Sequence, residues 1–162
     1  KQEKDRKILV FSQFTKVLKI IEQRLNNESI SYSYLDGKTE AKDRIKLVEE
    51  FNSSDTKRVF LISLKAGGTG LNLTSASMVV HFDPWFNPAS EDQASDRAHR
   101  IGQKNVVDII KLISKDTVEE KVVALQDYKK DIIEDVINSN LENSTSLKKL
   151  SREEIIDLFE NM

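Results

Sequence analysis

Two arginines and a glutamine near residue 100 are the side chains of this sequence best suited to chemistry. They lie in the segment Gln93-Ala-Ser-Asp-Arg97-Ala-His-Arg100-Ile-Gly-Gln103, which follows Asn87-Pro88, a pair typical of a helix start. On a helix, Gln93, Arg97 and Arg100 would share one face, and Asp96 is the only acid close to them. Because a guanidinium suits phosphate oxygens, we predict that this face binds an anion.

The helix that would carry these side chains is expected to run from Pro88 to Gly102, because glycine commonly ends a helix. Its small apolar stripe of Ala94, Ala98 and Ile101 is suited to packing against a sheet. His99 points away from the arginine face, and we expect it to pack or to support a neighbour rather than to bind a ligand.

Apolar runs and helical repeats alternate along the rest of the chain. Strands are expected at 8–12, 30–35, 58–64, 78–82 and 106–113. Helices are expected at 14–25, at 41–51 with Thr39 as its cap, and from a Thr117–Glu120 capping box to about residue 137. This alternation predicts an α/β fold, with an open parallel sheet, helices on both faces and ligands at the carboxyl ends of the strands.

The domain organisation follows from the same patterns. We expect one α/β domain over residues 1–137, a polar linker over 138–150, and a C-terminal extension in which residues 151–162 form a short amphipathic helix. The length of 162 residues is sufficient for one buried core.

Composition excludes several classes of protein. The chain has no cysteine, so it has neither a disulfide framework nor a thiolate metal site, and we expect no bound metal. No apolar run reaches the roughly 18 residues of a membrane span, so we expect a soluble intracellular protein. The net charge of −2 argues against strong DNA binding by the whole surface but leaves room for a local basic strip.

Four sequence blocks in a fixed order carry a family resemblance. They are Lys7-Ile-Leu-Val-Phe-Ser-Gln-Phe14, Ser63-Leu-Lys-Ala-Gly-Gly-Thr-Gly-Leu-Asn-Leu73, Phe82-Asp-Pro-Trp-Phe-Asn-Pro88 and the arginine segment. Together they resemble the signature motifs of Swi/Snf-type DNA translocases in helicase superfamily two. The resemblance implies a RecA-like fold and the second of two such lobes. The abundance of Lys, Asn, Ile and Ser is typical of an AT-rich bacterial genome. For a DNA translocase we therefore expect a cytoplasmic location at the bacterial nucleoid, or a nuclear one in a eukaryote.

The resemblance also implies roles for individual residues. Arg97 and Arg100 would act as arginine fingers on ATP, Gln93 would bond within the same cleft, and Gly70 and Asn72 would lie near the nucleotide. The implied DNA contacts are Ser12, Gln13, Lys38, Ser63, Lys65, Thr69, Trp85 and Phe86. The family commonly has two adjacent tryptophans where this chain has Trp85-Phe86, so an indole hydrogen bond from the second position is lost.

Simpler explanations remain open for each of these features. The arginines could form a solvated helix face with one Arg–Asp pair, and the glycines an ordinary turn after a strand. Phe86 could be a core residue, and Ser12 and Gln13 a polar strand end. A dinucleotide-binding enzyme is excluded because the glycines follow the third strand rather than the first.

What the sequence lacks shapes the functional prediction. Asp36-Gly-Lys-Thr39 ends like a P-loop, but Tyr32 stands where the first glycine is needed, and no Asp-Glu-x-His box occurs. We therefore predict the second motor lobe of an ATP-dependent double-stranded DNA translocase or remodeler. It would be an enzyme only as part of a DNA-dependent ATPase, and inactive alone.

The expected partners follow from that prediction. They are a first RecA-like lobe of the same polypeptide, double-stranded DNA and, as a further candidate, a DNA-bound protein, with no membrane. ATP with Mg²⁺ would be bound mainly by the first lobe, with no cofactor held by this chain alone. The alternatives are a lobe of a strand-separating DNA or RNA helicase, and a non-catalytic docking module on the same fold.

Overall fold

The predicted parallel α/β class is confirmed by the fold. The computed structural model describes residues 6–68, 70–100, 103 and 106–139, with side chains as far as residue 131. Within them one sheet contains β1 (Ile8–Ser12), β2 (Tyr32–Leu35), β3 (Val59–Ser63), β4 (Met78–His81) and β5 (Asp108–Lys111). The strand order is β2-β3-β1-β4-β5, and every neighbouring pair is parallel. The described residues up to Leu112 form one compact unit, and those from Ile113 onward belong to a second.

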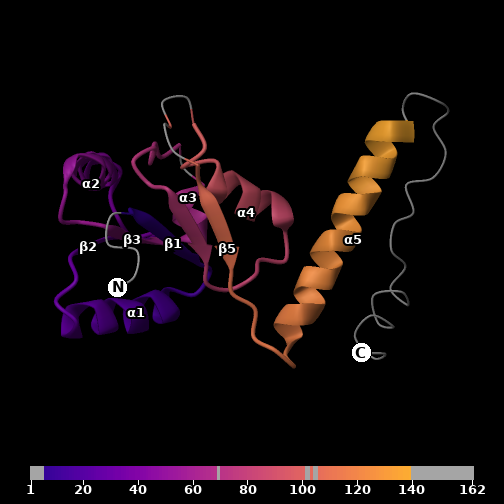
Figure 1. Cartoon of the computed structure of the whole chain (residues 1–162), viewed down its shortest axis with the longest axis horizontal. Coiled ribbons are helices and arrows are strands. Elements are labelled where there is room, and N and C mark those ends of the chain that lie inside the picture. The colour runs from indigo at the N-terminus through magenta and orange to yellow at the C-terminus, as the bar shows by residue number, and fades with distance from the viewer. Residues whose placement is uncertain (1–5, 69, 101–102, 104–105, 140–162) are drawn as a thin grey trace. The chain divides into compact units, whose positions relative to one another are not determined.

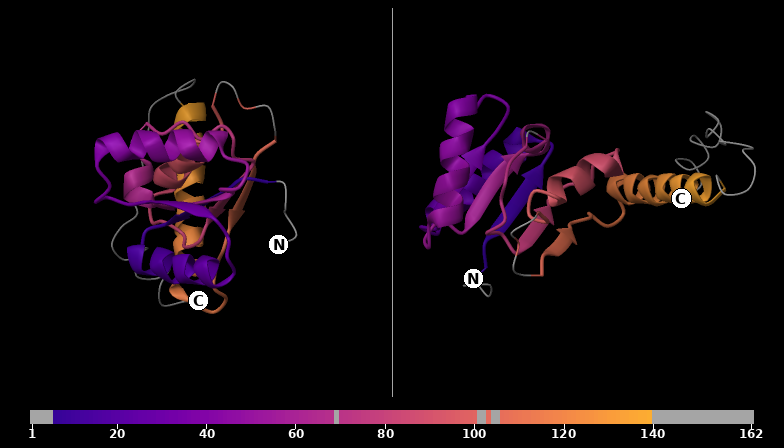
Figure 2. Two further views of the ribbon diagram at one scale, coloured as in Figure 1. Left: turned by 90° about the vertical axis from the view of Figure 1, so that its left-hand side faces the viewer. Right: turned by 90° about the horizontal axis from the view of Figure 1, so that it is seen from above.

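Helices cover both faces of this sheet (Figures 1 and 2). The first unit contains α1 (Thr15–Asn27), α2 (Ala41–Ser53), the one-turn α3 (Leu64–Gly67) and α4 (Pro88–Ser95). Parallel strands need right-handed crossovers, and the strand order therefore puts α1 on one face and α2, α3 and α4 on the other. The carboxyl ends of β1, β3 and β4, where the sequence blocks lie, consequently meet along one edge.

The core lies in the central strands because their side chains are apolar on both faces. Leu9 and Phe11 of β1 lie on one face of the sheet with Phe60 and Ile62 of β3. Leu61 of β3 lies on the opposite face and is also buried, so β3 is covered on both sides. Phe11 also sets a steric limit on α3: a Cβ on Gly67 would lie 2.7 Å from the Phe11 ring. Glycine is therefore needed here for close approach of the main chain.

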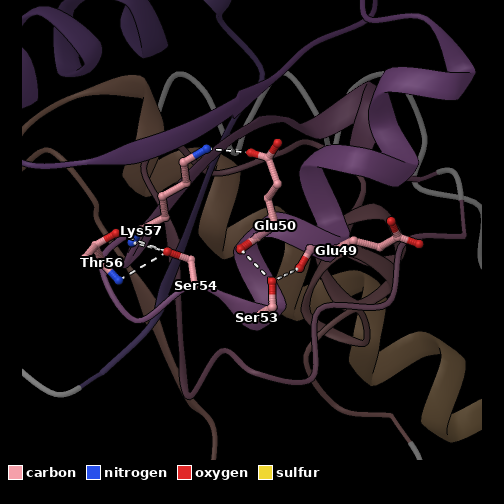
Figure 3. A network of polar contacts seen from close by, with 6 residues as sticks. All are labelled: Glu49, Glu50, Ser53, Ser54, Thr56 and Lys57. Atoms are coloured by element: carbon pink, nitrogen blue, oxygen red, sulfur yellow. Dashed lines mark hydrogen bonds and ion pairs between the residues drawn. The ribbon is translucent and has the colours of Figure 1, made fainter.

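A polar network joins the end of α2 to the turn that leads to β3 (Figure 3). The Ser53 hydroxyl donates to the Glu49 carbonyl at 2.8 Å, and the Ser54 hydroxyl oxygen accepts from Lys57 N at 3.0 Å. Lys57 Nζ then reaches back to the Glu50 carboxylate at 2.5 Å. The carbonyls left open at this helix end are satisfied by Lys7, whose Nζ donates to the Phe51 and Asn52 carbonyls at 2.5 and 3.0 Å. The following chain enters the sheet beside β1.

The predicted start of α4 is confirmed, but its predicted end is wrong. Asn87 accepts from Ala89 N at 3.2 Å, and Pro88 is the first helical residue. The helix ends at Ser95 rather than Gly102, and residues 96–98 form a turn with tighter i→i−3 bonds. The reason is a tertiary contact: Leu73 N–H donates a hydrogen bond to the Arg97 carbonyl at 3.0 Å. In a continuing helix this carbonyl would accept from a backbone N–H four residues later.

Two other helix starts differ in detail from their predictions. Thr39 is not the cap of α2, because Glu40 holds that position and the Thr39 hydroxyl accepts from Asp36 N at 3.1 Å. In the second unit, α5 (Val118–Ser139) does begin after Thr117, whose hydroxyl oxygen accepts from Glu119 N at 3.2 Å. The Glu120 carboxylate accepts from Asp116 N, one residue earlier than in an ordinary capping box.

The structure describes only the first part of the predicted C-terminal linker and extension. Because α5 extends to Ser139, the linker predicted at 138–150 does not begin at residue 138. The rest of that linker and the helix predicted at 151–162 lie outside the described residues. In the portion of the chain that is described, no helix has the length and apolarity needed to cross a membrane.

Candidate functional site

Arg97 is a buried cation whose Nε lacks a hydrogen-bonding partner among the described residues. Its side chain lies in the turn after α4 and retains only 5% of its exposure. Burial lowers the pKa of Arg97, the neighbouring Arg100 adds to that effect, and Asp96 opposes it. Arg100 and Asp96 are both exposed. The predicted shared helix face does not exist, but the turn still holds one buried and one exposed guanidinium.

The glycine loop lies against this turn. Besides the Leu73–Arg97 backbone bond, a Cβ on Gly68 would lie 3.7 Å from Gln93 Oε1, so the exposed Gln93 of α4 reaches toward the loop. The fold thus brings together residues of two sequence blocks that lie 24 and 25 positions apart in the chain. Gly70 adopts a left-handed φ of +56°, which glycine tolerates best.

Gly70 and Asn72 also border a cavity of about 600 Å³ between the glycine loop and α2. Its polar wall includes Arg44 and Asn52, and Asn52 Nδ2 donates to the Asn72 carbonyl at 2.8 Å. The Asn72 side chain itself is exposed. The structure therefore places these two nucleotide candidates beside a cavity, and Arg97 does not line it.

A second cavity, of about 610 Å³, gathers four of the predicted DNA contacts. It lies at the carboxyl ends of β1, β2 and β3, and its predicted lining residues are Gln13, Lys38, Ser63 and Lys65. The sequence prediction missed Lys16 and Lys19, which α1 adds to the same wall. Their three-residue spacing directly after the first sequence block was the available signal.

Local contacts shape this basic cavity. Asp36 Oδ1 accepts from Lys38 N at 2.9 Å and fixes the turn that presents Lys38. Lys19 lies 3.9 Å from the centre of the Tyr34 ring, and its ammonium donates to the Glu22 carboxylate at 2.7 Å. This hydrogen bond is the main cause that raises the pKa of Lys19. Lys65 is exposed at the opening. The cavity is therefore cationic, with Asp36 as the acid in its wall.

Ser12 is buried and does not line this cavity. It is 2% exposed, its hydroxyl donates to Asp83, and Phe14 N donates back to Ser12 Oγ at 3.0 Å. Asp83 also accepts from Gln13 N at 3.0 Å. Asp83 had no predicted role, yet its buried carboxylate joins the ends of β1 and β4 and holds Gln13 in position.

The two aromatic residues after β4 have different environments. Trp85 is half-buried and packs against the core, whereas Phe86 is 53% exposed, so the interpretation of Phe86 as a core residue is wrong. Trp85 N donates to the buried Glu91 carboxylate at 2.5 Å. Neither aromatic lines the basic cavity. Thr69, the remaining DNA candidate, lies outside the described residues.

The histidines reverse the expectation from the sequence. His99 is exposed and does not pack. His81 of β4 is buried instead, stacks on Phe11 with ring centres 5.7 Å apart, and hydrogen-bonds through Nε2 with Ser95 Oγ at 2.9 Å. Burial lowers the His81 pKa. No role was predicted for His81, because this residue lies in an apolar strand with no motif around it.

The parallel sheet, the strand-end loops and the arginine turn define a RecA-like α/β domain, and comparisons with known proteins agree with this class. The sequence model of one protein family, the helicase conserved C-terminal domain, matches residues 1–102, and the chain belongs to that family. A solved structure described as the C-terminal part of the Fun30 ATPase domain superposes with a TM-score of 0.74 at 40% identity. The match covers 87% of this chain and 49% of that one.

Curated relatives extend the comparison. An uncharacterized ATP-dependent helicase of Mycoplasma genitalium is 42% identical over 98% of this chain. A Caenorhabditis elegans homolog of a SWI/SNF-related regulator of chromatin is 43% identical over 94% of it. The resemblance to Swi/Snf-type helicases is thereby confirmed. The chain spans only 15–16% of the length of these two relatives.

Proposed function

We propose that this chain is the second motor lobe of an ATP-dependent double-stranded DNA translocase, with Arg97 and Arg100 acting on ATP. The observation that supports this most is the Arg97 guanidinium, buried with Nε lacking a partner among the described side chains. Such a group lowers stability unless a ligand supplies the missing contact. A non-catalytic docking module has no function that would offset this loss of stability.

The ligand that fits this arrangement is the triphosphate of ATP. A guanidinium donates hydrogen bonds to phosphate oxygens and stabilises the charge that builds on them during transfer, an effect worth roughly 10³–10⁵ in rate. Arg97 would provide this contact from the turn and Arg100 from the surface, with Gln93, Gly70 and Asn72 nearby. Because the sequence has no P-loop, Mg·ATP would be held mainly by a first lobe.

The basic cavity is the proposed contact with the DNA backbone. Lys38, Lys65 and Lys16 are exposed there, and Gln13 and Ser63 provide neutral hydrogen-bonding groups. Ammonium groups in such a cavity neutralise phosphates without reading sequence, as a translocase requires. Trp85 and Phe86 would contact DNA at a separate place, because they do not line this cavity.

An ATPase assay tests the arginine assignment. We expect no DNA-stimulated hydrolysis by the chain alone, and activity from a two-lobe protein in which it follows a P-loop lobe. In that protein Arg97→Met and Arg100→Met should each lower turnover strongly. The control is Arg24→Met, because Arg24 is an exposed residue of α1 paired with Glu28. Turnover by the isolated chain, or full turnover by both test variants, would contradict the proposal.

A salt titration of DNA affinity tests the basic cavity. Lys65→Gln and Lys38→Gln should each weaken binding of duplex DNA and reduce the slope of log K against log salt by about 0.9. Lys46→Gln on α2 removes the same charge outside the cavity and should leave the slope unchanged. If the slope of log K against log salt is the same for all three variants, the DNA does not bind in the basic cavity. Strand displacement on forked DNA would favour a strand-separating helicase instead.

A further inference from the structure

Glu91 is a buried acid with two contacts that the proposed function has not used. It lies on α4 with 1% of its exposure retained. One carboxylate oxygen accepts from Trp85 N at 2.5 Å, and the other forms an ion pair with Lys111 of β5. A carboxylate this deeply buried is costly unless it is both paired and hydrogen-bonded, and Glu91 is both.

The contact with Trp85 fixes the middle of a connection whose two ends are already held. At one end Phe82 N donates to the Phe11 carbonyl of β1 at 2.9 Å, and at the other Asn87 caps α4. Between these two ends Trp85 packs against the core and Phe86 is left exposed. Glu91 ties this connection to the first turn of the helix that follows it.

Lys111 ties the same carboxylate to the sheet. It lies on the edge strand β5, opposite His81 of β4, and its ammonium reaches inward to Glu91. The Glu91 side chain therefore bridges three elements: the connection after β4, the helix α4 and the strand β5. Gln93 follows two residues later on the same helix and reaches the glycine loop, so the aromatic segment is attached to the arginine side of the domain.

We propose that Glu91 is a positioning residue that, with Lys111, fixes the Trp85–Phe86 segment so that Phe86 is presented to duplex DNA. The choice of DNA as the ligand rests on the proposed function, whereas the positioning itself does not. An interfacial aromatic contributes only when it is held in a defined place, because ordering it on binding costs conformational entropy. A preformed segment removes that cost.

Trp85 provides a direct probe because it is the only tryptophan in the sequence. We expect Glu91→Met to remove both contacts, which should shift Trp85 emission to longer wavelength and raise its quenching by acrylamide. Glu91→Gln keeps an acceptor for Trp85 N–H but loses the ion pair, so its changes should be intermediate. Asp92→Asn removes one charge from an exposed neighbour on the same helix and should leave both signals unchanged.

The affinity for a short duplex separates the two parts of the proposal. In folded Glu91→Met, far-UV circular dichroism should match the wild type while duplex binding weakens roughly tenfold, the order expected for one hydrogen bond to a charged group. Altered Trp85 signals with unchanged DNA affinity would overturn DNA as the ligand of the segment and leave the positioning intact.

Unchanged emission and quenching in folded Glu91→Met would overturn the positioning role. If that variant does not fold, Glu91→Gln carries the test, and signals equal to the wild type in the folded glutamine variant would have the same meaning. Loss of DNA-stimulated ATPase in the Arg97 variant with normal Trp85 signals would support the proposed function independently of Glu91.

Discussion

Replacing Arg97 with methionine should stabilise the free chain while removing its contribution to ATP turnover. The guanidinium is buried, its Nε has no hydrogen-bonding partner in the described part of the chain, and its pKa is lowered mainly by burial. Methionine keeps an unbranched, flexible side chain of similar reach and removes the charge. Stability and function should therefore change in opposite directions at this one position.

The magnitude follows from the missing contact. A buried hydrogen-bonding group without a partner costs about 1–3 kcal/mol, and the loss of some packing around the guanidinium offsets part of the gain. We therefore expect Arg97→Met to raise the free energy of unfolding by about 1 kcal/mol. For a chain of this size that corresponds to a rise in Tm of about 2–4 °C.

The assay is thermal unfolding followed by circular dichroism in a buffer without phosphate, because phosphate could itself supply the missing partner. The matched control is Arg100→Met, which removes an exposed guanidinium three residues away and should change stability by less than about 0.5 kcal/mol. In the two-lobe protein, Arg97→Met should lower ATP turnover by roughly 10³–10⁵.

One result would refute this reasoning. If the folded Arg97→Met chain melts several degrees below the wild type, the guanidinium already has effective partners in the free protein. It would then be a structural cation, and the argument that it is held ready for a triphosphate would fail. A loss of ATPase activity in that variant would no longer identify a catalytic arginine, because instability alone would explain it.

Three further outcomes are expected. Gly67→Ala should lower the free energy of unfolding by about 1–3 kcal/mol in a urea titration, because its Cβ would lie 2.7 Å from a core ring, whereas Gly37→Ala meets no atom within 4 Å and should be neutral or slightly stabilising. The pKa of His81 is lowered in the folded chain, so its contribution to stability is complete above the unfolded pKa of about 6.5. As the pH falls below that value, the free energy of unfolding should decrease by at most about 1.4 kcal/mol per pH unit. His81→Asn should reduce this difference between urea titrations at pH 7.5 and pH 5.5. Asp83→Asn should cost about 1.5–3 kcal/mol in the same titration, because a buried charged acceptor of two hydrogen bonds is lost, and an unchanged midpoint would contradict that role.

Much of the fold was predictable because its signals are local. The strands of the sheet coincide with apolar runs, and all five predicted strands occur within the predicted ranges. Asn87 and Pro88 marked the start of α4 by side-chain chemistry that acts within three residues. Where a prediction depended on spacing alone, as at Thr39, the hydroxyl bonded to the preceding turn instead of to the helix.

The candidate site was predictable in its residue types but not in its geometry. The sequence identified Arg97 and Arg100 as unusual cations, and Gln13, Lys38, Ser63 and Lys65 as candidates that do share one cavity. It could not show that Arg97 is buried while Arg100 is exposed, since both were placed on a single helix face. Nor did it indicate Glu91, an acid in a polar helix that only its burial makes notable.

By itself, then, the sequence determined the α/β class, the order of the elements and the side chains able to bind phosphate, because hydrophobic periodicity and capping act over a few residues. Only the tertiary structure decided where α4 ends, since the acceptor at Arg97 is taken by Leu73, twenty-four positions earlier in the chain. The same holds for Asp83 with Ser12 and for Glu91 with Lys111. Contacts between distant segments form only after the sheet assembles, and no local pattern encodes them.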